Sequence, residues 1–165
     1  MDAWQVIQIL GLEPLPGEGG YYRETYRSGE RIPCSALSGR YPGDRSFGTA
    51  IYYLVTPESF STLHRVPGDE LFHFYLGDPV SMLRLYPDGS ANTAILGNDI
   101  LRGQLPQCLA PGGVWQGLRL AGEGDFALLG TTMSPGFEFD DYERGDRTAL
   151  QREFPAYANI IGRFT

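Results

Sequence analysis

The fold is decided by residues 49–86, whose sequence is TAIYYLVTPESFSTLHRVPGDELFHFYLGDPVSMLRLY. β-Branched and aromatic residues, which favour extended backbone, dominate four runs within this stretch. Turn-forming Pro, Gly, Asp and Ser stand between the runs. The predicted strands are Thr49–Val55, Phe60–His64, Leu71–Leu76 and Val80–Tyr86. Consecutive short strands without helices between them argue against a parallel α/β fold.

The same pattern continues on both sides of this stretch. Short helices are predicted near the two ends, one between an Asp2 N-cap and Gly11, the other over residues 146–154 with Asp146 as its cap. Residues 28–46 are expected to form a surface loop. Further strands are predicted at Tyr21–Tyr26, Asn92–Leu96, Gln107–Ala110, Val114–Leu120 and Phe126–Met133. We therefore expect one all-β domain over residues 1–165, a sandwich or jelly-roll barrel.

Composition narrows the classes of function. At 165 residues with 42% hydrophobic content, the chain has apolar material for one core and little room for two. The net charge of −7 argues against a nucleic-acid partner. No run approaches the roughly 20 apolar residues of a membrane helix, so we expect no membrane association and a cytoplasmic protein. All 13 basic residues are arginine, which excludes Schiff-base chemistry on lysine.

Both histidines of the chain fall within one short segment, which also matches a known motif. The first cupin motif, His-x-His-x3-Glu-x6-Gly, fits His64, Val66, Glu70 and Gly77, with valine in place of the second histidine. The second motif, Gly-x5-Pro-x-Gly-x2-His, resembles residues 105–116. Its glycine is displaced, and its histidine position is occupied by Gln116.

The whole chain resembles a small cupin family of largely uncharacterised proteins, often described as predicted sugar epimerases. The segments that carry the resemblance are 18–26, 49–54, 64–66, 69–70, 73–75, 77–79, 87–89, 111–115 and 134–139. The resemblance implies a cupin double-stranded β-helix, open at one end, with a site inside the barrel. It also implies a homodimer. The epimerase description rests on likeness of fold and does not establish a reaction.

Strand alternation assigns side chains to the barrel interior. Glu70 shares a face with Phe72 and Phe74, whereas His73 is expected outside the cavity or at its rim. His64 shares a face with Thr62 and Phe60. We therefore expect His64 and Glu70 to point into one cavity, with Phe72, Phe74, Trp115 and Gln116 as further ligand-binding residues.

The motif positions also indicate the chemistry. Only His64 and Glu70 stand at inherited ligand positions, so no metal or other cofactor is expected. Without a metal, His64 beside the Glu70 carboxylate suits a general base that removes a proton next to a carbonyl. A tyrosine would supply the acid. Tyr53 is our assignment, and Tyr75 and Tyr86 remain alternatives.

The ligand class stays open between sugar-like and anionic small molecules. Arg23 and Arg84 interrupt otherwise apolar strands and are candidates for binding an anionic group.

The acidic run at Glu138, Asp140, Asp141 and Glu143 is expected to be a solvated edge.

Four functions remain: a sugar isomerase or epimerase, a binding or sensing protein without turnover, a non-enzymatic structural role as in seed-storage relatives of the fold, and, least favoured, a metal-dependent oxygenase. We expect a homodimer because outward side chains such as Tyr75 and Leu71 need covering.

Overall fold

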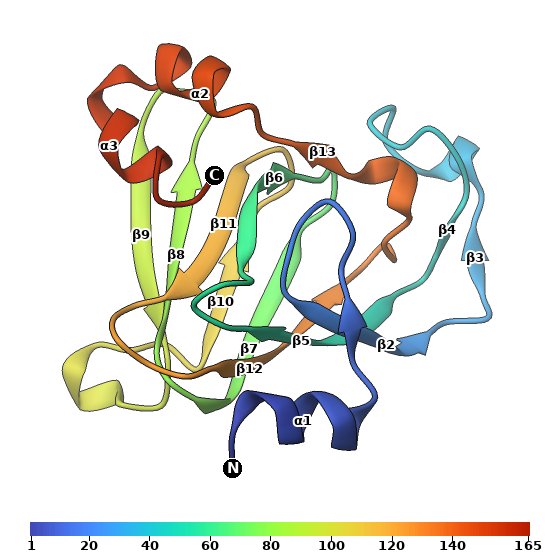
Figure 1. The fold of residues 1–165 in the computed structure, drawn as a ribbon. Helices are drawn as coiled ribbons and strands as arrows, with labels where there is room; N and C mark the ends of the chain where they lie inside the picture. Colours follow the sequence, from blue (N-terminus) through green and yellow to red (C-terminus); the bar gives the residue numbers. More distant parts are fainter.

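The computed structural model describes residues 1–165 as two antiparallel sheets that face each other in a jelly-roll barrel (Figure 1). The six-stranded sheet has the order β1-β2-β5-β12-β7-β10, and the five-stranded sheet has the order β13-β6-β11-β8-β9. The strands of the first sheet are β1 (Glu13–Pro14), β2 (Tyr21–Arg27), β5 (Thr49–Val55), β12 (Ala127–Met133), β7 (Glu70–Gly77) and β10 (Gln107–Ala110). Those of the second are β13 (Glu143–Arg144), β6 (Ser61–Arg65), β11 (Trp115–Leu120), β8 (Val80–Leu85) and β9 (Ala91–Leu96).

The predicted all-β jelly-roll fold is thus confirmed, and every predicted strand is present with ends that agree to within one residue. The predicted tight turn between β8 and β9 contains Gly89 with a φ of 83°, a left-handed conformation that glycine adopts without strain. A hydrogen bond from the Gly89 amide to the Tyr86 carbonyl, at 3.0 Å, closes this turn.

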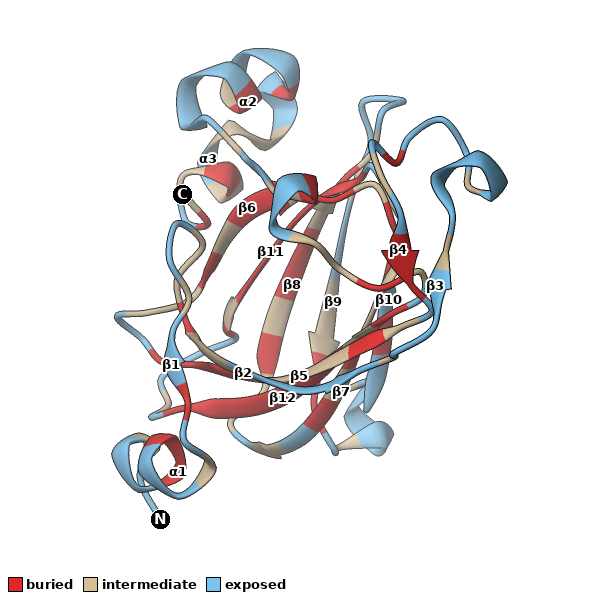
Figure 2. Ribbon diagram, turned by 90° about the vertical axis from the view of Figure 1, so that its right-hand side faces the viewer, coloured by how far each residue is buried: buried red, intermediate tan, exposed pale blue.

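The predicted N-terminal helix is α1 (Ala3–Leu10), and it packs on the outer face of the six-stranded sheet (Figures 1 and 2). Asp2 caps it by accepting a hydrogen bond from the Gln5 amide at 2.9 Å, and Gly11 ends it in the left-handed conformation. Its buried residues Val6 and Ile7 contribute to an apolar cluster that also contains Leu12, Leu54, Phe126 and Leu128. None of the helices is long and apolar enough to cross a membrane.

The C-terminal helices cover the outer face of the five-stranded sheet. Helix α2 (Arg147–Glu153) begins at the predicted Asp146 cap, and the short helix α3 (Ala158–Ile161), which was not predicted, follows a turn at Pro155–Tyr157. Their apolar residues pack with outward side chains of the sheet in a cluster of Leu63, Leu83, Leu85, Trp115, Leu150, Phe154, Ile161 and Phe164. Trp115 is therefore directed to the outer side of its strand.

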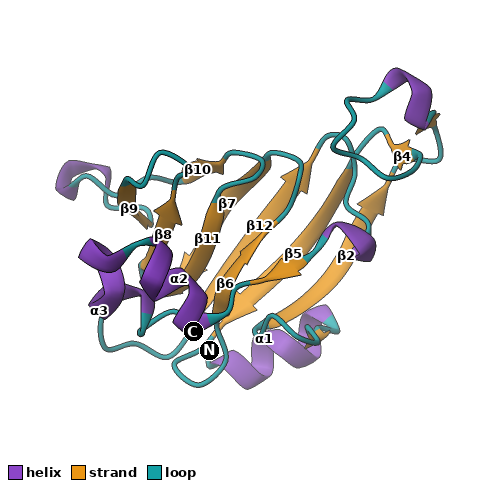
Figure 3. Cartoon of the chain, turned by 90° about the horizontal axis from the view of Figure 1, so that it is seen from above, coloured by secondary structure: helices purple, strands orange, loops and turns teal.

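A larger core fills part of the space between the sheets. It contains thirteen buried residues, from Val80, Met82 and Leu96 in one sheet to Phe74 and Leu129 in the other. Buried residues occur along the strands of both sheets, where the ribbon is coloured red in Figure 2. In the view from above, the strands of both sheets form the wall of the barrel, and loops connect them at its two ends (Figure 3).

Two predicted surface features are more buried than expected. Residues 28–46 were expected to be a surface loop, but they contain the two-stranded sheet of β3 (Arg31–Ile32) and β4 (Arg45–Ser46), and Arg45 is only 3% exposed. Its guanidinium makes a bidentate contact with Asp141, with Nε donating to Oδ2 at 3.0 Å. The expectation that Asp141 belongs to a solvated acidic edge was wrong, because the segment around it folds against β4.

Candidate functional site

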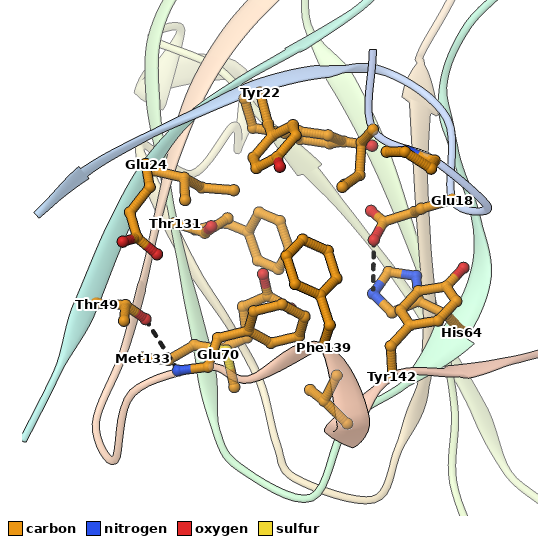
Figure 4. Close-up of a pocket in the computed structure, with 17 residues that line it drawn as sticks. Glu18, Tyr22, Glu24, Thr49, His64, Glu70, Thr131, Met133, Phe139 and Tyr142 are labelled. Carbon is orange, nitrogen blue, oxygen red and sulfur yellow. Dashed lines mark hydrogen bonds and ion pairs between the residues drawn. The ribbon is translucent and has the colours of Figure 1, made fainter. Parts of the chain in front are cut away.

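A cavity of about 120 Å³ lies inside the barrel beside the core (Figure 4). Its wall combines aromatic side chains with a few ionisable ones. The aromatic residues are Tyr22, Tyr53, Phe72, Phe137, Phe139 and Tyr142. The ionisable ones apart from tyrosine are Glu18, Glu24, His64 and Glu70. Aromatic walls with a few polar groups are typical of small-molecule sites.

Glu18 reaches the cavity from the glycine-rich turn between β1 and β2. Its carbonyl oxygen accepts hydrogen bonds from the Thr62 amide at 3.1 Å and the Thr62 hydroxyl at 2.8 Å, which fixes the turn against β6. Gly19 has a φ of 102°, and a Cβ there would overlap the Phe60 carbonyl oxygen. Only glycine therefore lets the turn approach β6 closely enough to place Glu18 in the cavity.

His64 is directed into the cavity by an irregularity in β6. The pairing of β6 with β11 shifts register between Gln116↔His64 and Leu118↔Ser61, so Ser61 and His64, three residues apart, approach each other on the same side. The His64 Nδ1–H donates to the Thr62 carbonyl oxygen at 2.9 Å. Because a carbonyl only accepts, the proton of neutral His64 resides on Nδ1 and Nε2 keeps a free lone pair.

The carboxylate that faces this lone pair is Glu18. Its Oε2 lies 3.8 Å from His64 Nε2 (Figure 4). Its Oε1 accepts a hydrogen bond from the Ser61 hydroxyl at 2.7 Å. The Tyr142 ring stacks on the imidazole with 5.3 Å between centroids. Burial raises the pKa of the Tyr142 hydroxyl to about 12, and Glu18 adds to this effect. His64 is thus held between a carboxylate and an aromatic ring, and its side chain is 3% exposed.

Glu70 reaches the cavity from β7, on the sheet opposite His64. Its Oε2 accepts a hydrogen bond from Gln116 Nε2 at 2.6 Å. Burial raises the pKa of Glu70 to about 7, with Glu18 adding to the rise and His64 opposing it. A carboxyl with this pKa exchanges protons near neutral pH, whereas an ordinary glutamate does not.

Tyr53, the assigned acid, also lines the cavity, but its hydroxyl is engaged. It donates to the Gly19 carbonyl at 2.8 Å, and burial, with Glu18 adding to the effect, raises its pKa well above the usual range. The two alternatives lie elsewhere. Tyr75 is 46% exposed and stacks on His73, and Tyr86 lies beyond the end of β8, outside the cavity lining.

Of the four apolar or amide residues expected to bind the ligand, only one lines the cavity. Phe72 lines it. Phe74 faces inward yet belongs to the packed core, because β7 carries it past the end of the cavity. Trp115 and Gln116 are neighbours on one strand, so alternation lets only one of them face inward. Gln116 is that residue, and Trp115 packs under the C-terminal helices.

The two arginines proposed for an anionic group do not line the cavity. Arg23 is exposed on the outer face of β2, where its guanidinium lies 5.6 Å from the centroid of the Tyr52 ring. Arg84 reaches across to β10 and β9 instead, donating to the Leu109 carbonyl at 2.6 Å and to Asn92 Oδ1 at 2.5 Å. The cavity lining contains no arginine.

His73 lies outside the cavity lining, as strand alternation predicts. Its Nε2 is 3.0 Å from the Thr132 hydroxyl, and its Nδ1 is 3.1 Å from Gln107 Nε2. These contacts are with β12 and β10, the two neighbours of β7. His64 therefore lies at the cavity inside the barrel, whereas His73 lies outside the cavity lining, against β12 and β10.

The residues at the inherited metal-ligand positions do not fit a metal. Val66 lines the cavity where the motif has a histidine and offers no donor atom. Gln116 directs an N–H group toward Glu70. The two side chains therefore make a hydrogen bond with each other, whereas in a metal-binding cupin the residues at these two positions would both face the ion. No cluster of three His, Cys, Asp or Glu side chains in the chain is arranged to hold a metal. We therefore derive no step through a metal.

Sequence reasoning missed Glu18 and the aromatic residues of the segment 137–142 as parts of the site. An acidic residue set among Gly17, Gly19 and Gly20 was a usable signal, since glycines allow a turn to approach another strand. Phe137, Phe139 and Tyr142 enter the site because their segment folds back over the barrel end, anchored by Asp141. That path depends on contacts distant in sequence.

Comparison with known proteins places these features in a family. Residues 4–144 match the family model described as cupin superfamily (DUF985). The uncharacterized protein YML079W of Saccharomyces cerevisiae is 31% identical over 150 residues, which are 86% of this chain and 71% of the yeast protein.

Two solved structures cover the whole of this chain. A hypothetical protein from Leishmania major is 30% identical, with a TM-score of 0.89 and 99% of its chain covered. Protein SO0799 from Shewanella oneidensis is 33% identical, with a TM-score of 0.88 and 98% of its chain covered. The predicted resemblance to a small cupin family is confirmed, and the chain belongs to the cupin superfamily family DUF985.

Proposed function

We propose that the barrel cavity binds a sugar-like molecule of monosaccharide size and isomerises or epimerises it, with His64 as the general base. The observation that supports this most directly is the pair of contacts made by His64. Nδ1 is held by the Thr62 carbonyl, which leaves the Nε2 lone pair beside Glu18 in the cavity. A base whose tautomer is fixed by a backbone acceptor is ready to take a proton from a bound ligand.

The size of the cavity supports a monosaccharide. One water needs roughly 10–15 Å³ of cavity volume on this measure. A cavity of about 120 Å³ therefore accommodates roughly eight to twelve non-hydrogen atoms, the size of a pentose or hexose. A sugar nucleotide is much larger and would extend out of the barrel.

The proposed reaction begins with proton transfer from carbon. His64 Nε2 removes the proton from the carbon next to the carbonyl, the electron pair of the C–H bond forms the enolate, and a proton is then returned to carbon. Glu70 suits the return step, because its pKa of about 7 leaves a large fraction protonated near neutral pH. It also approaches from the sheet opposite His64. Glu70 thus replaces Tyr53 as our candidate acid.

Binding without turnover is the second candidate function. It is favoured by the Tyr53 hydroxyl, which already donates to the Gly19 carbonyl and has a raised pKa. If Glu70 does not act as the acid, the site lacks a proton donor opposite His64 and would only hold its ligand.

Deuterium exchange distinguishes the two functions. Aldoses and ketoses, with and without amino groups, are incubated with the protein in D₂O, and loss of the proton next to the carbonyl is followed by NMR. We expect exchange with the wild type, a loss of at least about 100-fold in H64Q, in line with the usual contribution of a general base, and no change in the matched control H73Q. His73 is suitable because it lies outside the cavity lining.

Each outcome decides between the two functions. Binding of a sugar by the wild type without any exchange supports the binding protein and rejects the isomerase. Exchange that survives in H64Q rejects His64 as the base.

A further inference from the structure

The cavity wall has hydrogen-bond acceptors that lack donors. His64 Nε2 and Glu18 Oε2 face each other at 3.8 Å without a hydrogen bond. Outside the cavity lining, the buried Gln116 Oε1 and the Arg84 Nε of the paired position on β8 also have no hydrogen-bond partner. A buried acceptor without a donor is costly, so a ligand that satisfies this wall must bring N–H or O–H groups. Carboxylate and phosphate groups bring only further acceptors.

Negative charge in the cavity also exceeds positive charge. Glu18 and, above about pH 7, Glu70 contribute negative charge from different elements, and His64 is the only side chain of the lining that carries positive charge when protonated. Neither nearby arginine lines the cavity: Arg27 pairs with Glu24 at 2.8 Å and Glu138 at 3.0 Å, and the two Nη atoms of Arg84 donate to Leu109 and Asn92. The phenols of Tyr53 and Tyr142 remain neutral because burial raises their pKa values. A buried excess of negative charge attracts a cation.

Aromatic rings stand at the mouth of the same cavity. Phe139 is 60% exposed, although it lines the cavity, and it contacts Tyr22 and Phe137 edge to face with centroid distances of 6.5 and 5.3 Å. Tyr142 stacks on His64 further along the wall (Figure 4). Aromatic faces bind both organic cations and the apolar faces of sugar rings.

We propose that the ligand of this cavity is an amino sugar whose ammonium group binds Glu18. The proposal rests on the proposed sugar-binding function and narrows its ligand class. Because Glu18 Oε2 and His64 Nε2 are 3.8 Å apart, an ammonium on Glu18 and a C–H in front of His64 fit the same or adjacent carbons. The geometry points to an amino group on the carbon next to the carbonyl, as in a 2-amino aldose.

Binding of a cation has a further consequence for Glu70. The charge of the ammonium favours the ionised form of a nearby carboxyl and lowers its pKa. Since the pKa of Glu70 in the empty cavity is about 7, binding at about pH 6 is expected to release a fraction of one proton from Glu70, and the carboxyls that stay protonated remain available as the acid. A neutral sugar would not release one.

Isothermal titration calorimetry at about pH 6, with D-glucosamine, D-glucose and D-glucuronate as probes, tests the proposal. We expect D-glucosamine to bind at least about tenfold more tightly than D-glucose and D-glucuronate to bind more weakly than either. E18Q should remove the preference for the amine, because glutamine keeps the acceptor for Ser61 and loses the charge. E153Q, on the exposed side of α2, is the matched control and should keep the preference.

Two further measurements on the wild type do not depend on the folding of a variant. Raising the salt concentration should reduce the preference for the amine, and titrations in two zwitterionic buffers of different ionisation enthalpy should show proton release with D-glucosamine only. Equal affinity for D-glucose and D-glucosamine, or a preference that persists in E18Q, overturns the proposal while leaving sugar binding intact. Failure of all the probes to bind overturns the sugar-binding function as well.

Discussion

Gln116 on β11 donates a hydrogen bond from Nε2 to Glu70 Oε2 on β7, and this 2.6 Å contact connects the two sheets across the interior of the barrel. Gln116 stands where the second cupin motif has a histidine, and Glu70 stands at a ligand position of the first motif. The amide and the carboxylate thus satisfy each other in place of an ion. Metal analysis and substitutions at such motif positions test whether the site can hold a metal ion.

Metal content is the first test. We expect the purified wild type to carry well under one equivalent of transition metal by elemental analysis, because only two inherited ligand positions carry donors suited to such an ion. The double variant V66H/Q116H restores two imidazoles and should bind Zn²⁺ or Ni²⁺ at close to one equivalent. One metal per wild-type chain that disappears in H64A would contradict this prediction.

Stability against pH tests the environment of Glu70. Its pKa rises from 4.5 to about 7 on folding, so the neutral carboxyl stabilises the folded state below about pH 4.5 and this contribution is lost as the pH rises through 7. E70Q removes the ionisation. Relative to the wild type, E70Q should gain up to about 3 kcal/mol in free energy of unfolding between pH 5 and pH 8, in urea titrations. A difference that stays constant over this range would show that Glu70 titrates normally.

Two neighbouring glycines offer a matched pair for the turn that carries Glu18. Gly17 and Gly19 both have positive φ, of 82° and 102°, but only at Gly19 would a Cβ meet another atom, the Phe60 carbonyl oxygen. G17A should cost roughly 1–2 kcal/mol from backbone strain alone. G19A should cost more and also weaken ligand binding, because the turn must move away from β6. Thermal unfolding of both variants checks this, and equal losses would contradict it.

The outer face of the six-stranded sheet tests the expected homodimer. Tyr75 and Leu109, which are 46% and 42% exposed, flank His73 on adjacent strands β7 and β10. We expect light scattering at micromolar concentration to give twice the mass of one chain, with an isologous interface on this face. A Y75E substitution places a charge in that interface and should shift the protein toward monomer. A wild-type monomer at this concentration would contradict the prediction.

The fold was predictable because its signals are local. Runs of β-favouring residues between turn residues predicted the strands to within one residue, and the Asp2 and Asp146 caps marked the starts of α1 and α2. The same local alternation placed Glu70 and His73 on opposite sides of β7. Consistent local preferences of this kind specify a fold strongly.

The site was predictable only in part because its geometry depends on distant contacts. The carboxylate beside His64 is Glu18 and not Glu70, since the turn that carries Glu18 is fixed by hydrogen bonds to Thr62, more than forty residues away. The register shift in β6 that brings Ser61 beside His64 has no clear signal in the sequence. Trp115 and Gln116 were both expected in the cavity, although strict alternation along β11 already allowed only one of them.

At the cavity, a segment near the N-terminus contacts a segment from the C-terminal part of the chain. The Tyr142 hydroxyl donates to the Gly17 carbonyl at 3.3 Å, a contact between residues separated by 125 positions. Closing a loop of this length costs entropy, which the packing of the barrel strands between the two residues must offset. During synthesis the segment 137–142 emerges after nearly all of the barrel strands. Ligand binding therefore requires both of these segments to be in place, so it reports completed folding of the chain more strictly than its secondary-structure content does.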